Sequence, residues 1–294
     1  MSDSPAEIPF PDPALERLTA ILESLGPPLV VAFSGGLDST FLLYWAARAL
    51  GPEQVRAVTA VAPVFPRREL EEACAAAVRL GVPHHRLVVD LLALPAFRRN
   101  PPDRCYHCKH RLFSRMLEFA RELGAGTVCD GTQADDSADY RPGRRALREL
   151  GVRSPLAEAG IGKDRLRRYC RRLGLAAAGK PSGACLASRF PYGTPVTAPD
   201  LARIERAEAS LAALGFDQVR VRFHGDTARI ELAPDRLEAA VARRAAIVHT
   251  LKACGFRYVA LDLEGYRTGS LNEGLGPGTE APGGGPLQRS GSAP

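Results

Sequence analysis

Residues 34–39 have the sequence of a loop that could bind phosphate. The segment reads SGGLDS and joins an apolar, β-branched run at 29–34 to a helical run that ends at Gly51. Glycines let the backbone approach an anion closely, and the first N–H groups of a helix point toward that anion. The residues expected to bind a nucleotide here are Ser34, Gly35, Gly36, Asp38, Ser39 and Thr40.

Asp38 sets this loop apart from a site for phosphate alone, because a carboxylate would repel a bare phosphate group. We expect it to hold a Mg²⁺ ion that bridges the phosphates, and we include it among the catalytic candidates. The alternative is an ordinary strand–helix turn with a capping Ser or Asp, which the full SGGLDS string disfavours. The string resembles the PP-loop of ATP pyrophosphatases, which implies transfer of AMP rather than of the γ-phosphoryl group.

A second polar cluster occupies residues 130–136, at the end of an apolar run at 126–131. Ligands of open α/β sheets bind at the carboxyl ends of the strands, so this cluster can face the same crevice as the loop. Its carboxylates could share the metal, and its hydroxyl could contact the nucleotide. Turn chemistry explains the Asp-Gly pair at 130–131 but less readily the polar residues after it. The candidates are Asp130, Thr132, Asp135 and Asp136.

Cys105 and Cys108 form a C-x-x-C at the start of a helical run, and Lys109, directly after them, is a further catalytic candidate. A helix N-terminus lowers the pKa of a thiol, and this spacing lets both sulfurs bind one metal. The pair alone could belong to a zinc, a redox or an iron–sulfur site. A zinc site would want a second pair or histidine ligands, and the sequence has no second C-x-x-C.

Cys185 lies among small residues in the stretch 176–199, which has no hydrophobic periodicity. Small neighbours give a substrate access, and nearby cations favour the thiolate. We therefore expect Cys185 and Arg189 to be catalytic, with a buried structural cysteine as the alternative. The other four cysteines lie in helical or strand contexts and are expected in the core: Cys74, Cys129, Cys170 and Cys254.

The elements that must position these residues alternate along the chain. Apolar runs at 29–34, 55–62, 84–91 and 126–131 are separated by helical patterns, the last of them over 109–123, which predicts an α/β fold with a doubly wound parallel sheet. The long polar segment 131–160 is expected to be a functional loop before a short helix. After residue 199 the pattern changes to helix, strand, strand, helix, strand, which indicates a second, smaller α/β domain. The predicted divisions are 1–175, a site loop or linker at 176–199, a small domain at 200–268 and a disordered tail at 269–294.

Two arginines on one predicted strand of the small domain suggest a phosphate site. In VRVRF the period of two places Arg220 and Arg222 on the same strand face. Neighbouring guanidinium groups repel unless an anion lies between them, and a nucleotide phosphate fits that requirement. Arginines on the solvated face of a half-buried strand are the alternative.

Composition excludes few classes of protein. The chain has 294 residues, is 45% hydrophobic and carries a formal net charge of +6, mostly as arginine. This excess is compatible with nucleic acid, but no Lys/Arg block interleaved with aromatic residues supports such a partner. No apolar run reaches the ~20 residues that span a bilayer, and the first residues lack a signal-peptide pattern. We expect a cytoplasmic protein with no membrane partner.

Five segments taken in order resemble the LarE-type ATP-dependent sulfur transferases over roughly residues 14–268: AFSGGLDST, NPPDRCYHCK, DGTQADDSADYRPG, PSGACLASRFPYG and VRVRFHG. The resemblance implies a PP-loop, adenine nucleotide alpha hydrolase-like fold. It also implies that a carboxylate of pyridinium-3,5-biscarboxylic acid mononucleotide is adenylated and then converted to a thiocarboxylate, in nickel-pincer nucleotide biosynthesis for lactate racemase. Arg220 and Arg222 would bind the phosphate of that substrate.

The resemblance leaves two sources of sulfur open. In some relatives the cysteine that matches Cys185 attacks the adenylate and is spent as dehydroalanine; in others three cysteines hold a 4Fe–4S cluster. This sequence has all three, Cys105, Cys108 and Cys185, and we favour the cluster because an open iron position can carry a transferable sulfide. The resemblance further implies a homo-oligomer, often a hexamer, and a metal site at subunit contacts that includes Glu208 and Glu231.

Two other functions fit part of the sequence. A PP-loop tRNA thiolase would also combine adenylation with cysteines, but it needs an RNA-binding surface that the short second domain hardly supplies. A non-catalytic nucleotide-binding iron–sulfur carrier would bind ATP without releasing pyrophosphate. We expect an enzyme that uses ATP, Mg²⁺ and a 4Fe–4S cluster on a small nucleotide substrate.

Overall fold

The computed structural model describes residues 12–135, 142–180, 183–267 and 269–273. Its larger sheet contains four parallel strands in the order β3-β2-β1-β4. They are β1 (Leu29–Ala32), β2 (Val55–Val61), β3 (His84–Val88) and β4 (Thr127–Cys129). Leu29 pairs with Val55 on one side and with Thr127 on the other, so β1 lies at the centre of the sheet. The predicted doubly wound α/β class is confirmed.

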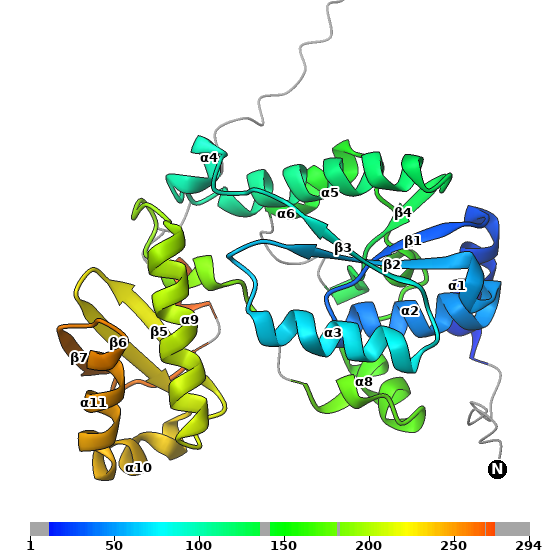
Figure 1. Ribbon diagram of the computed structural model, residues 1–294. Helices are drawn as coiled ribbons and strands as arrows, with labels where there is room; N and C mark the ends of the chain where they lie inside the picture. Colours follow the sequence, from blue (N-terminus) through cyan, green and yellow to red (C-terminus); the bar gives the residue numbers. More distant parts are fainter. Residues whose placement is uncertain (1–11, 136–141, 181–182, 268, 274–294) are drawn as a thin grey trace, which may run out of the picture.

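Helices cover both faces of this sheet (Figure 1). Successive residues of β1 point to opposite faces: Val31 packs in one apolar cluster with Phe41 of α2, and Val30 in the other with Phe113 of α5. Strands that are buried on both faces read as continuous apolar runs, which explains the sequence of β1. The helices of this part are α1 (Pro13–Leu25), α2 (Leu37–Leu50), α3 (Arg67–Arg79), α4 (Pro95–Arg98), α5 (Arg104–Glu122), α6 (Pro142–Glu149), α7 (Pro155–Glu158) and α8 (Lys163–Arg172).

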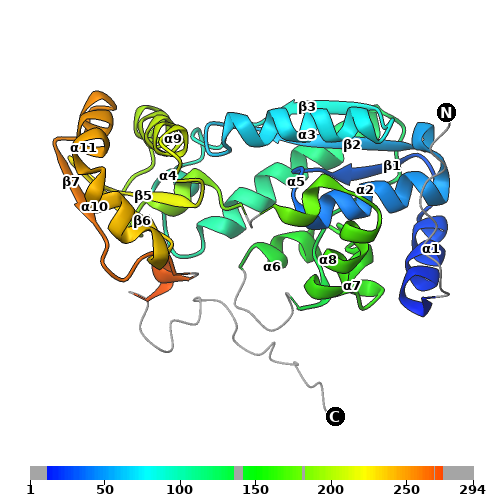
Figure 2. The same ribbon diagram turned by 90° about the horizontal axis from the view of Figure 1, so that it is seen from below.

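The smaller sheet contains β5 (Val219–His224), β6 (Thr227–Leu232) and β7 (Tyr258–Leu261). β5 and β6 are antiparallel, whereas β7 is parallel to β6 and is reached through α10 (Leu237–Ala242) and α11 (Arg244–Ala253). Helix α9 (Ala198–Ala213) precedes β5 and lies beside this sheet in both views (Figures 1 and 2). The predicted helix, strand, strand, helix, strand order is therefore observed.

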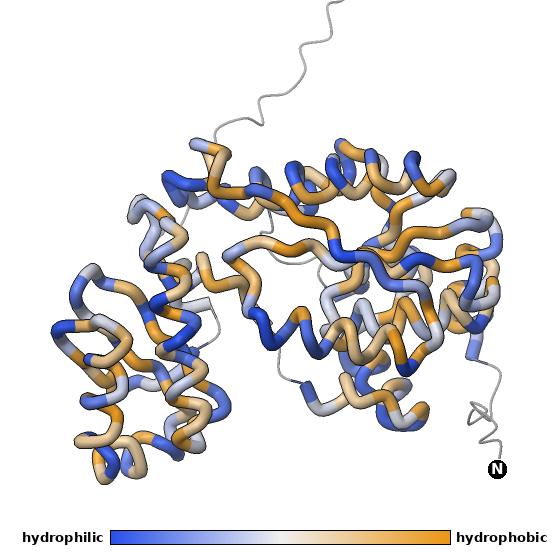
Figure 3. Tube along the Cα trace, viewed as in Figure 1, coloured by the Kyte–Doolittle hydropathy of each residue, from blue (hydrophilic) through white to orange (hydrophobic). Residues whose placement is uncertain are grey.

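The part of the chain that carries the larger sheet contacts the part that carries the smaller sheet through apolar and polar groups. The rings of Phe190 and Phe223 lie 4.8 Å apart, and both belong to an apolar cluster that continues into the larger sheet. Figure 3 shows hydrophilic residues at the start of α3, on the side that faces α9. There the Arg67 backbone N–H donates to Glu205 of α9 over 2.6 Å.

Several predicted elements have different boundaries in the structure. The helix expected over 109–123 begins at Arg104, which places Cys105 and Cys108 within its first turns. The predicted loop at 131–160 contains α6 and α7, and the aperiodic stretch 176–199 contains two single 3₁₀ turns, Ala176–Gly179 and Leu186–Arg189. Further 3₁₀ turns are Pro52–Gln54, Pro234–Arg236 and Ser270–Asn272. Residues 274–294 of the expected tail lie outside the described residues.

Within the part of the chain that the structure describes, no helix combines the length and apolar character needed to cross a membrane.

Candidate active site

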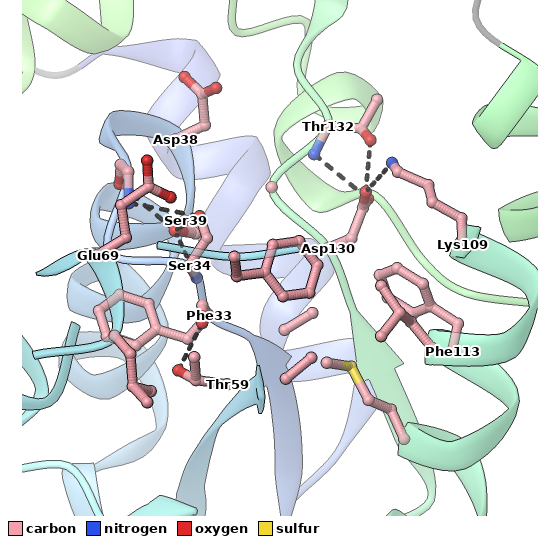
Figure 4. A pocket seen from close by; sticks show the side chains of 18 residues that line it. Phe33, Ser34, Asp38, Ser39, Thr59, Glu69, Lys109, Phe113, Asp130 and Thr132 are labelled. Carbon is pink, nitrogen blue, oxygen red and sulfur yellow. Dashed lines mark hydrogen bonds and ion pairs between the residues drawn. The ribbon is translucent and has the colours of Figure 1, made fainter. Parts of the chain in front are cut away.

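A cavity of about 340 Å³ opens at the carboxyl ends of β1 and β4, where the SGGLDS loop meets the polar residues after β4 (Figure 4). One polar wall comes from Ser34, Asp38 and Ser39, and the facing wall from Asp130 and Thr132, beside which helix α5 supplies Lys109. The apolar wall, on which an adenine ring could pack, includes Phe33, Phe65, Leu112, Phe113 and Met116. Apolar walls with a few convergent polar groups are typical of nucleotide sites.

Hydrogen bonds inside the loop hold its shape. The Ser39 hydroxyl accepts from the Ser34 backbone N–H over 3.3 Å and lies 3.1 Å from the Ser34 hydroxyl. Gly35 has a φ of 68°, and a Cβ at this position would lie 2.9 Å from the Ala73 Cα of α3. A residue with a side chain would therefore push the loop and α3 apart. Gly35 brings the loop against the helix.

Asp130 organises the other wall of the cavity. It is buried and accepts from the Thr132 hydroxyl over 2.5 Å and from the Ser154 hydroxyl over 2.6 Å. The Lys109 ammonium lies 3.7 Å from the same carboxylate. At Gly131 a Cβ would lie 3.0 Å from the Ser39 backbone N, so glycine lets this wall approach the first turn of α2.

The acidic residues of the cavity are the candidate protein ligands of the expected Mg²⁺. Asp38 lines the cavity and offers the oxygen ligands that Mg²⁺ takes. Glu69 of α3 lines the cavity too, and burial raises the pKa of its carboxyl group although Lys180 opposes this. No three His, Cys, Asp or Glu side chains among the described residues form a group that could hold a metal ion. Mg²⁺ at this position would thus depend on phosphate and water oxygens in addition to Asp38.

Among the described residues, three expected nucleotide ligands do not line this cavity: Gly35, Thr40 and Asp135. Thr40 is buried, and its backbone N–H makes a helical bond to Gly36. Asp135 accepts from the Lys163 backbone N–H over 2.7 Å, which places its carboxylate at the start of α8. Asp136 lies outside the described residues.

Cys105 and Cys108 lie in the first turns of α5, and the Cys185 thiol is near enough to raise the pKa of both, so the fold brings a distant cysteine to the C-x-x-C pair. Burial, and then the Cys185 and Cys105 thiols, raise the pKa of Cys108 well above its usual range. Cys105 is exposed as a whole residue, but its sulfur is surrounded by protein atoms. This burial of the sulfur, and then the Cys185 thiol, raise the pKa of Cys105 as well. A positively charged metal centre would stabilise the thiolate forms.

Two residues that the sequence reasoning did not single out hold this group together. Asn100 is buried with a φ of 55°, and its side-chain amide donates to the Pro191 carbonyl over 2.7 Å. Arg104 is also buried; it bonds the Asn100 side chain and donates to the Ala187 carbonyl over 2.8 Å. These bonds tie the start of α5 to the chain after Cys185. Both residues lie in the NPPDRCYHCK segment, but nothing in that segment identifies partners about 90 residues away.

Arg189, which the sequence predicts to be catalytic, bonds to other groups of the protein in this structure. It forms a two-bond ion pair with Glu208 of α9, with both N–O distances at 2.9 Å, and its side chain is 2% exposed. Its remaining nitrogen donates to the Ala184 and Cys185 carbonyls over 2.7 and 3.1 Å. These bonds hold the backbone at Cys185. The guanidinium group expected to take part in catalysis is thus already used within the protein.

The two strand arginines have different surroundings. Arg222 is buried, lies 2.7 Å from Glu231 and donates to the Ser188 carbonyl over 2.8 Å. The Glu231 carboxylate therefore already offsets the repulsion between Arg220 and Arg222 that the sequence analysis assigned to a phosphate. Arg220 lines a second cavity of about 710 Å³ between α3 and α9, and burial, followed by the charge of Arg189, lowers its pKa. Among the described residues, Glu69 alone lines both cavities.

Glu208 and Glu231, the expected metal ligands of the smaller part, are both paired with arginines. Glu208 pairs with Arg189 and also accepts from the Val221 backbone N–H over 2.9 Å. Glu231 is 1% exposed and contacts Arg229 as well as Arg222. A metal at either carboxylate would have to displace a guanidinium group.

A parallel β3-β2-β1-β4 sheet with an SGGLDS loop between β1 and α2 defines the PP-loop class of ATP-using enzymes. In agreement, the sequence model of the asparagine synthase family matches residues 24–100. The chain is 40% identical over 258 residues to the pyridinium-3,5-bisthiocarboxylic acid mononucleotide synthase of Lactiplantibacillus plantarum, which covers 88% of this chain and 93% of that protein. The chain therefore belongs to this LarE family and is an ATP-dependent enzyme.

Two uncharacterised proteins are also similar. One, from Synechocystis sp., is 43% identical over 263 residues, which is 89% of this chain and 97% of that protein. The other, from Methanocaldococcus jannaschii, is 28% identical over 240 residues, which is 82% of this chain and 91% of that protein. Similarity of this extent includes both sheets.

Proposed function

We propose that this enzyme adenylates a carboxylate of pyridinium-3,5-biscarboxylic acid mononucleotide with ATP, releases pyrophosphate, and then converts the activated carboxylate to a thiocarboxylate. The name of the Lactiplantibacillus relative supports the product class. The observation that carries the proposal is the double role of α5. Its first turns bear Cys105 and Cys108, and the following turns supply Lys109 and Phe113 to the ATP-type cavity.

In this proposal ATP occupies the first cavity. The N–H groups and hydroxyls of Ser34 and Ser39 bind the phosphates, and Asp38 holds Mg²⁺, which would neutralise phosphate charge and orient the triphosphate. Lys109 lies near enough to Asp130 to exchange that partner for the α-phosphate, where charge develops in the transition state. The apolar side chains of α5 cover the base.

We assign the second cavity to the pyridinium nucleotide. Arg220 is the cation of β5 that lines it, and a phosphate would stabilise a guanidinium group whose pKa is lowered by burial and by Arg189. Arg222 would support the site indirectly by holding Ser188. Because Glu69 borders both cavities, the substrate carboxylate would meet the α-phosphate of ATP close to this residue.

For the sulfur step, Cys105, Cys108 and Cys185 would hold a 4Fe–4S cluster. The absence of a three-ligand single-ion site among the described residues does not oppose this, because a cluster binds each thiolate to a separate iron. When bound, the cluster would present an open iron position for a transferable sulfide. Arg189 and Arg104 keep Cys185 beside α5 for this purpose. A homo-oligomer, which is often a hexamer in the family, remains a prediction of the resemblance, and a cytoplasmic location remains a prediction from the sequence.

The test is turnover by protein purified without oxygen. After iron and acid-labile sulfide are measured, the protein is incubated with MgATP and the biscarboxylate nucleotide, and pyrophosphate and thiocarboxylate are quantified. We expect pyrophosphate release that depends on this substrate and a mass increase of the product that corresponds to exchange of oxygen for sulfur. Cys105→Ala should remove iron and product while substrate-dependent pyrophosphate release persists; Cys74→Ala on α3 is the matched control.

The other outcomes separate the alternatives. A protein that forms product, contains no iron and loses one H₂S from Cys185 uses the sacrificial route. Pyrophosphate release with tRNA but not with the pyridinium nucleotide would replace the proposal with a tRNA thiolase. Nucleotide binding without any pyrophosphate release would indicate a carrier.

A further inference from the structure

Lys180 places a cation at the edge of the SGGLDS loop. Its ammonium donates to the Gly35 carbonyl over 3.2 Å and lies 2.6 Å from the Glu72 carboxylate of α3. The side chain is 23% exposed, so the charge is neither fully hydrated nor enclosed. Lys180 belongs to the stretch between α8 and Cys185, and no part of the sequence signature of the loop includes it.

Helix α3 fixes where this cation stands. Gly35 packs directly on Ala73, and Glu72 precedes Ala73 in the same helix. Glu69, one turn earlier, lines the cavity with Ser34 and Asp38 (Figure 4). Lys180 itself lines the second cavity, and from that side its ammonium contacts the loop whose N–H groups are expected to receive phosphate. A long, flexible side chain can cover a short distance from a carbonyl of such a loop to a phosphate bound on it.

Glu72 does not depend on Lys180 for a partner. Arg68 donates to the other carboxylate oxygen of Glu72 over 2.8 Å. Although burial opposes the change, hydrogen bonds from Lys180 and then Arg68 lower the pKa of Glu72. If Lys180 moves to another anion, Glu72 keeps one cation at hydrogen-bond distance. The ion pair with Glu72 thus holds Lys180 near the loop, and Lys180 can leave it without leaving Glu72 unpaired.

We propose that Lys180 is a catalytic residue that binds the β- and γ-phosphates of ATP and neutralises the leaving pyrophosphate. In the adenylation step a carboxylate oxygen of the substrate forms a bond to the α-phosphorus, and the bond from that phosphorus to the bridging oxygen breaks. The electron pair of the broken bond leaves with pyrophosphate, where N–H donors of Lys180 meet the new charge. The inference rests on the ATP site of the proposed function and requires none of its sulfur chemistry.

A pair of variants distinguishes phosphate binding from a purely structural role. Lys180→Ala removes the ammonium, and Glu72→Gln removes the carboxylate that competes with phosphate for it. We expect Lys180→Ala to raise the Kd of a non-hydrolysable ATP analogue about 10- to 30-fold, as for loss of a charge-assisted hydrogen bond. Glu72→Gln should lower the same Kd about 2- to 5-fold. Binding is measured by calorimetry on the full chain with Mg²⁺.

Control measurements show whether the change in Kd comes from contact with the phosphates or from a change in the fold. Adenosine, which has no phosphate, should bind Lys180→Ala and the unchanged protein within about twofold, and Lys180→Arg should restore most of the analogue affinity. Lys252→Ala, on the exposed side of α11, should change neither Kd. Far-UV circular dichroism verifies that each variant is folded.

Two results would overturn the inference. One is an analogue Kd that Lys180→Ala leaves within twofold. The other is an increase of the analogue Kd by Glu72→Gln as large as the increase by Lys180→Ala. Lys180 would then act only by joining its segment to α3. Neither readout uses the pyridinium nucleotide, so failure of the proposed sulfur-transfer reaction would be seen separately.

Discussion

At the scale of single residues, the same residue type serves different purposes according to its partners. Arg222 and Arg189 are buried and face carboxylates of the protein, Glu231 and Glu208 respectively. Arg220, on the same strand as Arg222, lines the larger cavity, as Arg189 also does. A buried charge that loses its partner destabilises the fold, whereas a charge that lines a cavity can also contact a ligand bound there. The three arginines should therefore respond differently to truncation.

Arg222→Ala and Arg220→Ala provide a matched comparison on β5. Arg222→Ala leaves Glu231 without its nearest cation, and we expect it to lower the free energy of unfolding by about 3–5 kcal/mol. Arg220→Ala should change stability little but raise the KM for the pyridinium nucleotide about 10- to 100-fold through loss of a charge-assisted bond. Urea denaturation and steady-state pyrophosphate release check the two effects. Equal destabilisation by both variants would contradict the assignment.

At the scale of elements, α5 connects the two halves of the proposed chemistry. Residues one turn apart on a helix share a face, so the turn after the C-x-x-C can bring Lys109 into the first cavity beside Phe113. Parallel strands place the loop after β1 and the polar residues after β4 at one edge, opposite this helix. Asn100 and Arg104, at the start of α5, then attach the chain that follows Cys185.

Substitution of Asn100 tests this attachment. Asn100→Ala loses the bonds to Pro191 and Arg104 and places alanine in the left-handed region, so we expect about 2–4 kcal/mol of destabilisation and reduced iron content after anaerobic reconstitution. Asn100→Gly loses the same side-chain bonds but relieves the backbone, and should be less destabilised by about 1 kcal/mol. Thermal denaturation and iron analysis provide the measurements. If both variants retain full iron binding, Asn100 is not what holds the thiols together.

At the scale of the whole molecule, each sheet contains a histidine whose neutral form the fold favours. Burial, and then the charge of His85, lower the pKa of His84, whose ring nitrogen lies 2.7 Å from the Thr59 hydroxyl. Burial, and then Arg229, lower the pKa of His224. Below a pH of about 6.5 the unfolded chain binds protons that these folded-state groups resist, so acidification destabilises the fold.

The free energy of unfolding should therefore fall as the pH drops from 7 through 6.5 toward the lowered folded-state pKa values. His84→Gln and His224→Gln should each flatten this part of the curve, and the double variant should flatten it most. Glu69, whose pKa burial raises, contributes in the opposite sense and remains present in all these variants. Urea titrations at half-unit pH intervals measure the curves. An unchanged slope in the double variant would show that other groups control acid stability.

The sequence by itself determined the fold class, the PP-loop class and the family. These depend on local patterns: continuous apolar runs predict strands buried on both faces, and SGGLDS needs only its own strand and helix to present a phosphate site. Recognition of five ordered segments then indicated a family that the extended similarity confirms. The boundaries of α5 were less accessible, because the first turn of a helix lacks a full apolar period.

Only the tertiary structure decided what the long-range partners are. Glu208 pairs with Arg189 and Glu231 with Arg222, which no spacing in the sequence reveals, because ion pairs between separate elements depend on how those elements pack. The same packing brings Cys185 to Cys105 and Cys108 through Asn100 and Arg104, and places Lys180 at the loop. Local sequence specifies which groups can react, and packing specifies which of them remain available to a substrate.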